Sequence, residues 1–239
     1  FAFFGDTLSL TDSTSDVSLV SFDPIPPKKY FGAKHVSYGR VELAFNYSVP
    51  GLSVEVLVPD TLNYILLPDE NSDTANFWFD QADLDSLVLL LKNDSVIIDT
   101  NNIFLRNHKL QRQELTLLDE QLWADEPAVL IPSHPLVGVD STSIVILSPT
   151  DTLPPSSVHL RSPMRLEIHR SRRYPESYLY LPDSALTSIV GSYNDSLEFT
   201  IQSLRKDDVG NLDFVVETDS SESLILIITD SEKREIERR

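Results

Sequence analysis

The chain has 239 residues, of which 41% are hydrophobic and 9% aromatic, which is too apolar for an intrinsically disordered protein. Nineteen Lys and Arg residues against 37 Asp and Glu residues give a net charge of −18, which argues against binding to nucleic acids or to an anionic membrane surface. The absence of Cys excludes disulfides, thiolate metal sites and cysteine nucleophiles.

The first part of the chain changes from a linker-like composition to strand periodicity. Residues 1–29 contain Ser/Thr/Asp-rich spacers and the run Pro24-Ile25-Pro26-Pro27, which predicts an entry linker. From Val36 to Val49, apolar and polar residues alternate, as in a strand with one buried face. Short apolar runs predict further strands at 54–58, 62–67, 76–79, 86–91 and 96–105.

Two segments have an ambiguous pattern. Leu84 to Leu91 could form one amphipathic helix, but its marginal length and flanking turn residues favour a buried strand. Residues 107–121 are the one segment for which we expect a helix, although Leu115, Thr116 and Leu117 also suit a strand.

A second set of strand patterns follows about one hundred residues after the first. It comprises 128–131, 143–147, 164–169, 177–181 and 196–203. A further hairpin pattern, at 212–217 and 224–229, resembles the opening of a third module. Because antiparallel sandwiches close at about 100 residues, we expect an all-β chain of tandem immunoglobulin-like β-sandwich domains. The expected boundaries are a linker at 1–29, sandwiches at 30–108 and 109–205, and a partial third β module at 206–239.

The stretch from Tyr178 to Thr200 resembles the end of bacterial Ig-like domains of the S-layer-associated type. Such domains close with an apolar strand, a small-residue loop ending near Gly-x-x-Asn, here Gly191 to Asn194, and a strand ending Phe-x-x. Ser188 departs from the Asp that is commoner before the apolar pair of that loop. Gly210-Asn211-Leu212, the Phe3-Phe4 start and the Asp85 to Leu91 run are similar to Ig-like-domain lipoproteins of the Bacteroidetes.

This resemblance implies a lipoprotein anchored in the bacterial outer membrane, on its periplasmic or its surface face. The anchoring Cys would lie upstream, because the sequence contains none. Phe1 is not an initiator Met, and we expect the sequence to be a mature or trimmed part of a longer chain. The implied partners are other envelope proteins, with the chain as a subunit of an outer-membrane complex.

Several kinds of catalytic site lack their motifs. No Gly-x-Gly occurs for a phosphate loop, and Gly191-Ser192 lacks the second Gly of a nucleophile elbow. The histidines form no metal-binding helix pair, and we expect each on the surface or at a sandwich rim. They are His35, His108, His134, His159 and His169. With 37 acidic residues, spacing alone cannot select a glycosidase carboxylate pair.

Calcium is the one metal for which the sequence offers candidate ligands. Asp80, Asp83 and Asp85 place hard oxygen donors in a turn-like segment, as do Asp69, Glu70 and Asp73. Neither set matches an EF-hand loop, and solvated acidic loops are the simpler interpretation.

A basic cluster and two Trp residues are candidates for contact with a partner. The cluster comprises Arg161, Arg165, Arg170, Arg172 and Arg173. It could bind an acidic partner or protect an exposed strand edge. Trp78 and Trp123 could line a glycan platform, but the alternation Phe77-Trp78-Phe79 makes core packing at least as good an interpretation.

Together these features predict a non-catalytic structural or interaction protein of the bacterial cell envelope, whose Ig-like modules act as spacer or docking surface. The alternative is a carbohydrate- or calcium-binding accessory module of an envelope enzyme. No cofactor is expected, apart from Ca²⁺ in that alternative.

Overall fold

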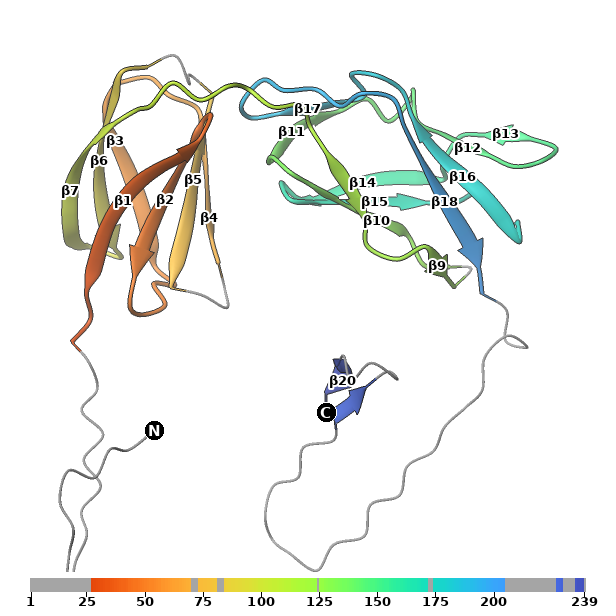
Figure 1. Cartoon of the computed structure of the whole chain (residues 1–239), viewed down its shortest axis with the longest axis horizontal. Coiled ribbons are helices and arrows are strands. Elements are labelled where there is room, and N and C mark those ends of the chain that lie inside the picture. The colour runs from red at the N-terminus through yellow and green to blue at the C-terminus, as the bar shows by residue number, and fades with distance from the viewer. Residues whose placement is uncertain are drawn as a thin grey trace, which may run out of the picture. The chain divides into compact units, whose positions relative to one another are not determined.

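The computed structural model describes residues 27–69, 73–80, 84–123, 125–171, 174–204, 227–229 and 235–238. All regular elements within these ranges are strands (Figure 1). None of the described residues belongs to a helix that could cross a membrane. The chain divides into one compact unit that ends at Leu204 and a second one at Arg205–Arg239.

Seven strands form the first sandwich. They are β1 (Tyr30–Ser37), β2 (Arg40–Phe45), β3 (Leu52–Val58), β4 (Tyr64–Pro68), β5 (Thr74–Phe79), β6 (Ser86–Asn93) and β7 (Val96–Phe104). One sheet has the order β1-β2-β5-β4 and the other the order β3-β6-β7. Lettered A to G in chain order, these sheets are ABED and CFG, which is the constant-type immunoglobulin topology.

The core of the first sandwich follows from the alternation that the sequence shows. Val41, Leu43 and Phe45 of β2 are buried, and the residues between them are half-buried. β6 repeats the pattern with Leu87, Leu89 and Leu91, and all six side chains pack in one apolar cluster. The period of two therefore places one face of each sheet in a shared core.

The second sandwich contains eleven strands. They are β8 (Leu115–Leu117), β9 (Gln121–Leu122), β10 (Ala128–Pro132), β11 (Leu136–Val139), β12 (Val145–Leu147), β13 (Thr152–Leu153), β14 (Ser157–Ser162), β15 (Arg165–His169), β16 (Glu176–Leu181), β17 (Leu186–Ser188) and β18 (Leu197–Ser203). Its sheets have the orders β14-β15-β10-β8 and β13-β12-β16-β18-β9, and β11 pairs with β17 alone. This is again an Ig-like order, with β13 as an added edge strand. β9 pairs in parallel with the last strand, β18.

A separate apolar cluster fills the second sandwich. Leu130 and Leu166 come from one sheet, and Ile146, Leu179 and Ile201 come from the other. In the unit after Leu204, the described part is an antiparallel pair of β19 (Ile227–Thr229) and β20 (Glu235–Arg238).

The predicted all-β, Ig-like fold is confirmed, and so is a strand rather than a helix at Leu84 to Leu91. The helix expected at 107–121 is wrong: this segment is irregular apart from a bridge at Gln113, β8 and the start of β9. The physical reason is that Leu115 and Leu117 are needed on one face of β8, where they pack against the core. The boundaries at 30–108 and 109–205 and the third module remain proposals, and the predicted strand at 212–217 lies outside the described residues.

Candidate functional site

The loop between β17 and β18 forms a tight turn that presents two apolar side chains. The amide of Gly191 donates to the carbonyl of Ser188 at 3.0 Å, and the amide of Ser188 donates to the carbonyl of Ser192 at 3.0 Å. Gly191 has a φ of +78°, which closes the turn without Cβ strain. Ile189 and Val190 therefore occupy the two central positions of the turn.

These two residues pack against the first sandwich. Ile189, Val190 and Trp78 of β5 form a buried apolar cluster in which their exposed fractions are 9%, 3% and 5%. Tyr38, Ile65 and Leu67 of the first sandwich pack around the cluster. We call these six residues the junction cluster. Because its members come from both sandwiches, the cluster binds one sandwich to the other through apolar burial.

Gly39 allows the close approach that the junction cluster needs. Its φ is +64°, and a Cβ atom at this position would lie 2.5 Å from Cγ1 of Val190 and 2.8 Å from the carbonyl oxygen of Phe79. The amide of Phe79 donates to the Gly39 carbonyl at 2.9 Å, which holds the turn against β5. Only Gly fits this position without a shift of backbone or of Val190.

A stack of polar and aromatic groups borders the junction cluster. The guanidinium of Arg40 lies 5.3 Å from the ring centre of Trp78, and its Nε donates to Oδ1 of Asn76 at 2.9 Å. On the other side, the ring of His134 meets Trp78 edge-on at 5.6 Å. Burial lowers the pKa of His134, and Arg40 lowers it further, although Glu114 opposes the shift. Burial therefore disfavours the charged form of His134 next to Trp78.

The segment that connects the sandwiches is fixed by buried polar contacts of the second one. Oε1 of Gln113 lies 3.2 Å from Nδ1 of His134, and the Gln113 amide donates to the Tyr193 carbonyl at 3.0 Å. The side chain of Asn194, which is fully buried, accepts from the Leu186 amide and donates to the Pro182 carbonyl. The bond to Tyr193 ties Gln113 to the loop that carries Ile189 and Val190.

The structure separates the predicted basic cluster into residues with different environments. Arg161 of β14 and Arg165 of β15 both donate to the carboxylate of Glu167, at 2.7 and 3.0 Å. The two guanidinium groups lower the pKa of Glu167. Arg161 thus lies on the edge strand β14, and the Glu167 carboxylate that it shares with Arg165 lies on the neighbouring strand β15.

Arg170 instead makes hydrogen bonds within the second sandwich. Its Nη1 donates to Oγ of Ser203 and its Nη2 to the carbonyl of Trp123, both at 2.7 Å, and the side chain is half-buried. Arg170 therefore links the end of β15 to β18 and to the chain after β9. Arg172 and Arg173 lie outside the described residues, and a partner-binding role of the cluster remains a prediction.

No three of the predicted calcium ligands come together among the described residues. The carboxylate of Asp80 accepts hydrogen bonds from the main-chain amide and the side-chain amide of Asn63. The main-chain carbonyl of Asp85 accepts one from the Leu105 amide. Asp83 and Glu70 lie outside the described residues. Within the described ranges, no three His, Asp or Glu side chains group closely enough to hold a metal ion. Calcium binding remains a prediction.

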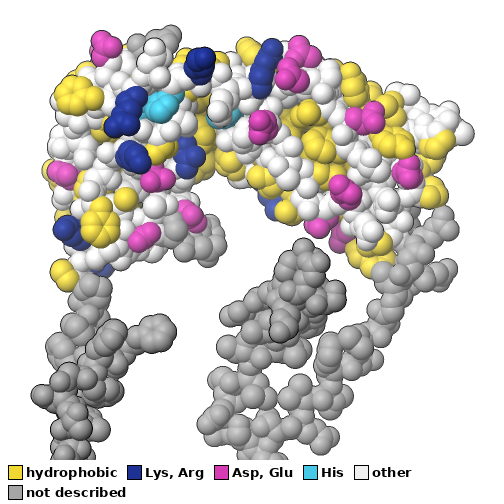
Figure 2. Space-filling view, viewed as in Figure 1, with side chains coloured by type: hydrophobic (Ala, Val, Ile, Leu, Met, Phe, Trp, Pro, Cys, Tyr) yellow, Lys and Arg dark blue, Asp and Glu magenta, His cyan; other side chains and the backbone are white. Residues whose placement is uncertain are grey.

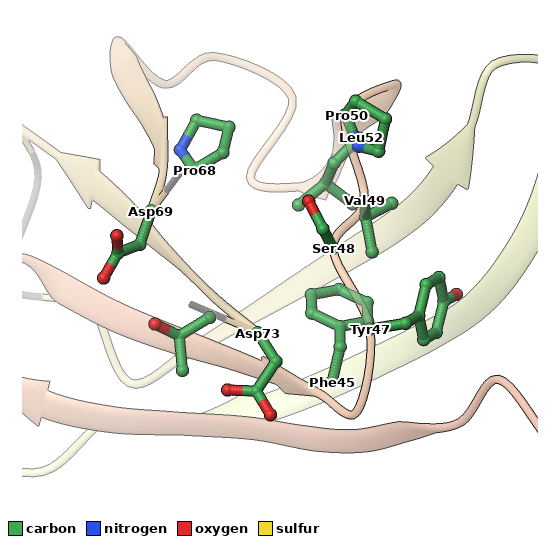
Figure 3. Close-up of a pocket in the computed structure, with 10 residues that line it drawn as sticks. Phe45, Tyr47, Ser48, Val49, Pro50, Leu52, Pro68, Asp69 and Asp73 are labelled. Carbon is green, nitrogen blue, oxygen red and sulfur yellow. The ribbon is translucent and has the colours of Figure 1, made fainter. Parts of the chain in front are cut away.

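A cavity of about 370 Å³ opens at one end of the first sandwich. Residues 45–52 face Pro68, Asp69, Asp73 and Thr74 across it (Figure 3). Phe45, Tyr47 and Leu52 supply apolar surface, and Asp69 and Asp73 of the second calcium set supply carboxylates. The cavity thus combines aromatic rings with acidic groups, which suits a small polar ligand with an apolar face.

Trp78 is buried in packing and forms no open platform. Phe77 and Phe79 lie in the core of the first sandwich, and Trp78 points to the opposite side, as the alternation predicted. Trp123 is half-buried. Its main-chain carbonyl accepts a hydrogen bond from Arg170, and its main-chain amide donates one to the carboxylate of Glu126. His35 and His134 are buried, so neither is a surface residue, and of the two predicted positions only a sandwich rim is left for them.

The sequence interpretation did not identify the turn that carries Ile189 and Val190 as a contact site. One signal was present: two large apolar residues between Ser188 and Gly191 at the centre of a turn would face water unless another surface covered them. Gly39 gave no such signal, because its role depends on a residue far along the chain.

No protein-family model matches the chain, and no curated protein sequence matches it. Solved structures with a similar fold include the N-terminal part of the bacterial S-layer protein SbsC, with a TM-score of 0.31, 10% identity, and coverage of 74% of this chain and 44% of that one. The Bacteroides ovatus glucan-utilization protein SGBP-B, in complex with a mixed-linkage heptasaccharide, has a TM-score of 0.31 and 7% identity over 72% of this chain and 45% of that one. A Dpr2 Ig1-Ig2 structure in complex with DIP-Theta has a TM-score of 0.24 and 6% identity, and covers 76% of this chain and 100% of that one.

The chain spans less than half the length of the first two of these structures. With identities no higher than 10% and TM-scores no higher than 0.31, these likenesses carry no functional argument.

Proposed function

We propose that the chain is a non-catalytic structural and interaction protein of the bacterial cell envelope. In this role the two Ig-like sandwiches act as a spacer of fixed geometry and as a docking surface for an envelope protein complex. The observation that carries the proposal is the junction cluster, because a buried contact between sandwiches holds them at one mutual orientation.

The physical basis is the difference between a packed joint and a flexible linker. A polar linker would let two domains move independently, and relative domain motion is the default unless the interface between them is large and hydrophobic. Here a Trp, an Ile and a Val are buried together, and the connecting segment is hydrogen-bonded to the second sandwich. Such a joint fixes the orientation of one sandwich relative to the other, as a spacer requires.

The proposed location rests on the sequence. The resemblance of Tyr178 to Thr200 to S-layer-associated Ig-like domains supports a place in the cell envelope. Attachment to the outer membrane would come from a lipid anchor outside this sequence, and the partners would be other envelope proteins. The charge of −18 supports a role without nucleic acid.

A distance measurement between spin labels tests the spacer. Because the chain has no Cys, Ser53→Cys and Ser141→Cys would give one label on each sandwich, at exposed positions. Val190→Asp should disrupt the junction cluster by burying a charge, without touching either core. The matched control is Val137→Asp, because Val137 is 53% exposed.

We expect a narrow distance distribution for the parent and for Val137→Asp, and a broad one for Val190→Asp. Equally broad distributions in all three proteins would overturn the spacer, because the cluster would then not fix the sandwiches.

The cavity lined by Tyr47, Asp69 and Asp73 supports a second candidate function, a carbohydrate- or calcium-binding accessory module of an envelope enzyme. Gel retardation in a panel of soluble polysaccharides tests the first ligand, and calorimetric titration with CaCl₂ tests the second. Tyr47→Ala should abolish retardation if the ring stacks on a sugar, and Tyr193→Ala, at an exposed Tyr away from the cavity, serves as control. Absence of both retardation and heat would leave the spacer as the sole candidate.

A further inference from the structure

The last strand of the first sandwich has no ladder on its outer side, where β1 lies close to it but pairs with β2. Among the described strands, β7 pairs with β6 alone. The amide of Thr100 donates to its neighbour's carboxylate, Oδ1 of Asp99, at 2.8 Å, and the amide of Arg106 donates to Nδ1 of His35 at 2.8 Å. Main-chain groups of an antiparallel strand alternate between its two sides, so Asn102 and Phe104 direct theirs to the same outer side.

The second sandwich shows how the same edge is covered when a strand is available. Its last strand, β18, is flanked by β9, which runs parallel to it. The amide of Gln202 donates to the carbonyl of Glu120 at 2.8 Å, and the amide of Leu204 donates to that of Leu122 at 2.9 Å. β7 and β18 hold equivalent places in their sheets, next to β6 and β16. Among the described strands, none forms a ladder with β7 on its outer side as β9 does with β18, because the nearby β1 pairs with β2.

β7 also lacks the usual protection of a free edge. Edge strands are normally short, or carry charged residues or Pro. β7 has nine residues and one charged side chain, Asp99, and its Val96, Ile97 and Phe104 are 69%, 62% and 77% exposed. A long edge that has no ladder partner is a template for another strand.

The surroundings of this edge are basic although the chain is acidic. A cavity of about 320 Å³ lies between β1 and the end of β7, and Lys34 and Arg106 line it together with Ala33 and Ile103. Figure 2 shows Lys and Arg side chains gathered on this face of the first sandwich. The charge of the edge is thus complementary to an acidic segment.

We propose that the free edge of β7 binds an extended, acidic segment of a partner protein, which adds as a strand parallel to β7. The main chain of the segment would accept from the amides of Asn102 and Phe104, as Glu120 and Leu122 do for β18. Apolar side chains of the segment would enter the cavity beside β1, and acidic ones would meet Lys34 and Arg106. This inference rests on the proposed docking function and names the surface and the partner chemistry.

The covering segment of the second sandwich supplies a defined probe. A labelled peptide with the sequence of residues 116–123, Thr-Leu-Leu-Asp-Glu-Gln-Leu-Trp, is acidic and has the apolar side chains of a segment that already pairs this way. Fluorescence anisotropy measures its binding to the full chain. Amide hydrogen exchange by NMR then shows where it binds, and we expect slower exchange at Asn102 and Phe104.

Two variants test the mode of binding. Asn102→Pro removes an outward amide and leaves the hydrogen bonds to β6 intact, so we expect at least about tenfold weaker binding. The double variant Lys34→Glu, Arg106→Glu keeps the main-chain amides of β7 and reverses the charge beside them, so it should weaken binding. It tests the mode of binding independently if Asn102→Pro fails to fold. Lys92→Glu, at a site that pairs with Glu55 on β3, is the charge control and should bind as the parent does.

Three results would overturn the inference. They are no exchange protection at Asn102 and Phe104 at about 1 mM peptide, unchanged binding by Asn102→Pro, and a parent dimer in sedimentation that Asn102→Pro dissociates. The last result would make a second copy of the chain the occupant. The spin-label test does not involve β7, so a narrow distance distribution without peptide binding would reject the strand addition and leave the spacer standing.

Discussion

Trp78 shows how far a single residue can be interpreted from the sequence. The alternation Phe77-Trp78-Phe79 predicted that Trp78 points away from its neighbours, and it does, toward the junction cluster. The sequence could not predict what covers the indole, because Ile189 and Val190 follow more than a hundred residues later. Local periodicity determines the face of a side chain, whereas its partner depends on tertiary structure.

His134 makes the stability of the protein depend on pH. Its pKa is lowered in the folded chain, mainly by burial, so between that value and the ordinary value of 6.5 the unfolded chain binds more protons. Stability is therefore complete above about pH 6.5 and falls as the pH decreases below it.

We expect His134→Gln to reduce this loss, measured as urea midpoints between pH 7.5 and 5. Some dependence should remain, because burial lowers the pKa of His35 as well. Parallel curves for parent and variant would show that His134 is not held neutral by its surroundings.

Two glycines with a left-handed backbone conformation allow us to measure how much the close packing at the junction contributes to the free energy of unfolding. Gly191→Ala would cause only backbone strain, since nothing lies within 4 Å of a Cβ there, and should cost about 1 kcal/mol. Gly39→Ala would add the clash with Val190 and Phe79, for a total above about 2 kcal/mol. Equilibrium unfolding gives both values, and equal losses would mean that the junction yields to the extra methyl group.

Among the elements, strand prediction succeeded where alternation extended over five or more residues. β2, β6, β16 and β18 lie within or overlap predicted runs, whereas β9 and β13, with two residues each, are too short to show a period. β1 was missed because Gly32, Lys34 and Ser37 interrupt its apolar pattern. The helix prediction at 107–121 was wrong because helix propensity is a weak local preference that core packing overrides.

Arg161 and Arg170 should differ in their contribution to the free energy of unfolding, because their contacts differ. Arg170→Ala removes two hydrogen bonds to a half-buried cation, and we expect a loss of about 1–3 kcal/mol in the free energy of unfolding. Arg161→Ala affects an exposed ion pair and should stay within about 0.5 kcal/mol of the parent. Thermal unfolding measures both, and a neutral Arg170→Ala would return that residue to the candidate docking cluster.

At the scale of the whole molecule, composition and repeated strand patterns sufficed to predict an all-β, Ig-like chain. Both sandwiches follow one strand order, and they differ at the edge of the last strand, which β9 covers in the second sandwich alone among the described residues. Neither the junction cluster nor this open edge could be predicted, because each results from residues that only the folded chain brings together. Both features support a role in spacing and docking.

The most direct test of the central claim is a set of residual dipolar couplings for the backbone amides of residues 30–204. These couplings report the orientation of each sandwich relative to a common alignment frame. If the junction cluster holds the sandwiches together, one alignment tensor will fit the couplings of both. Two tensors of different magnitude would show that the sandwiches move independently and would contradict the proposed spacer.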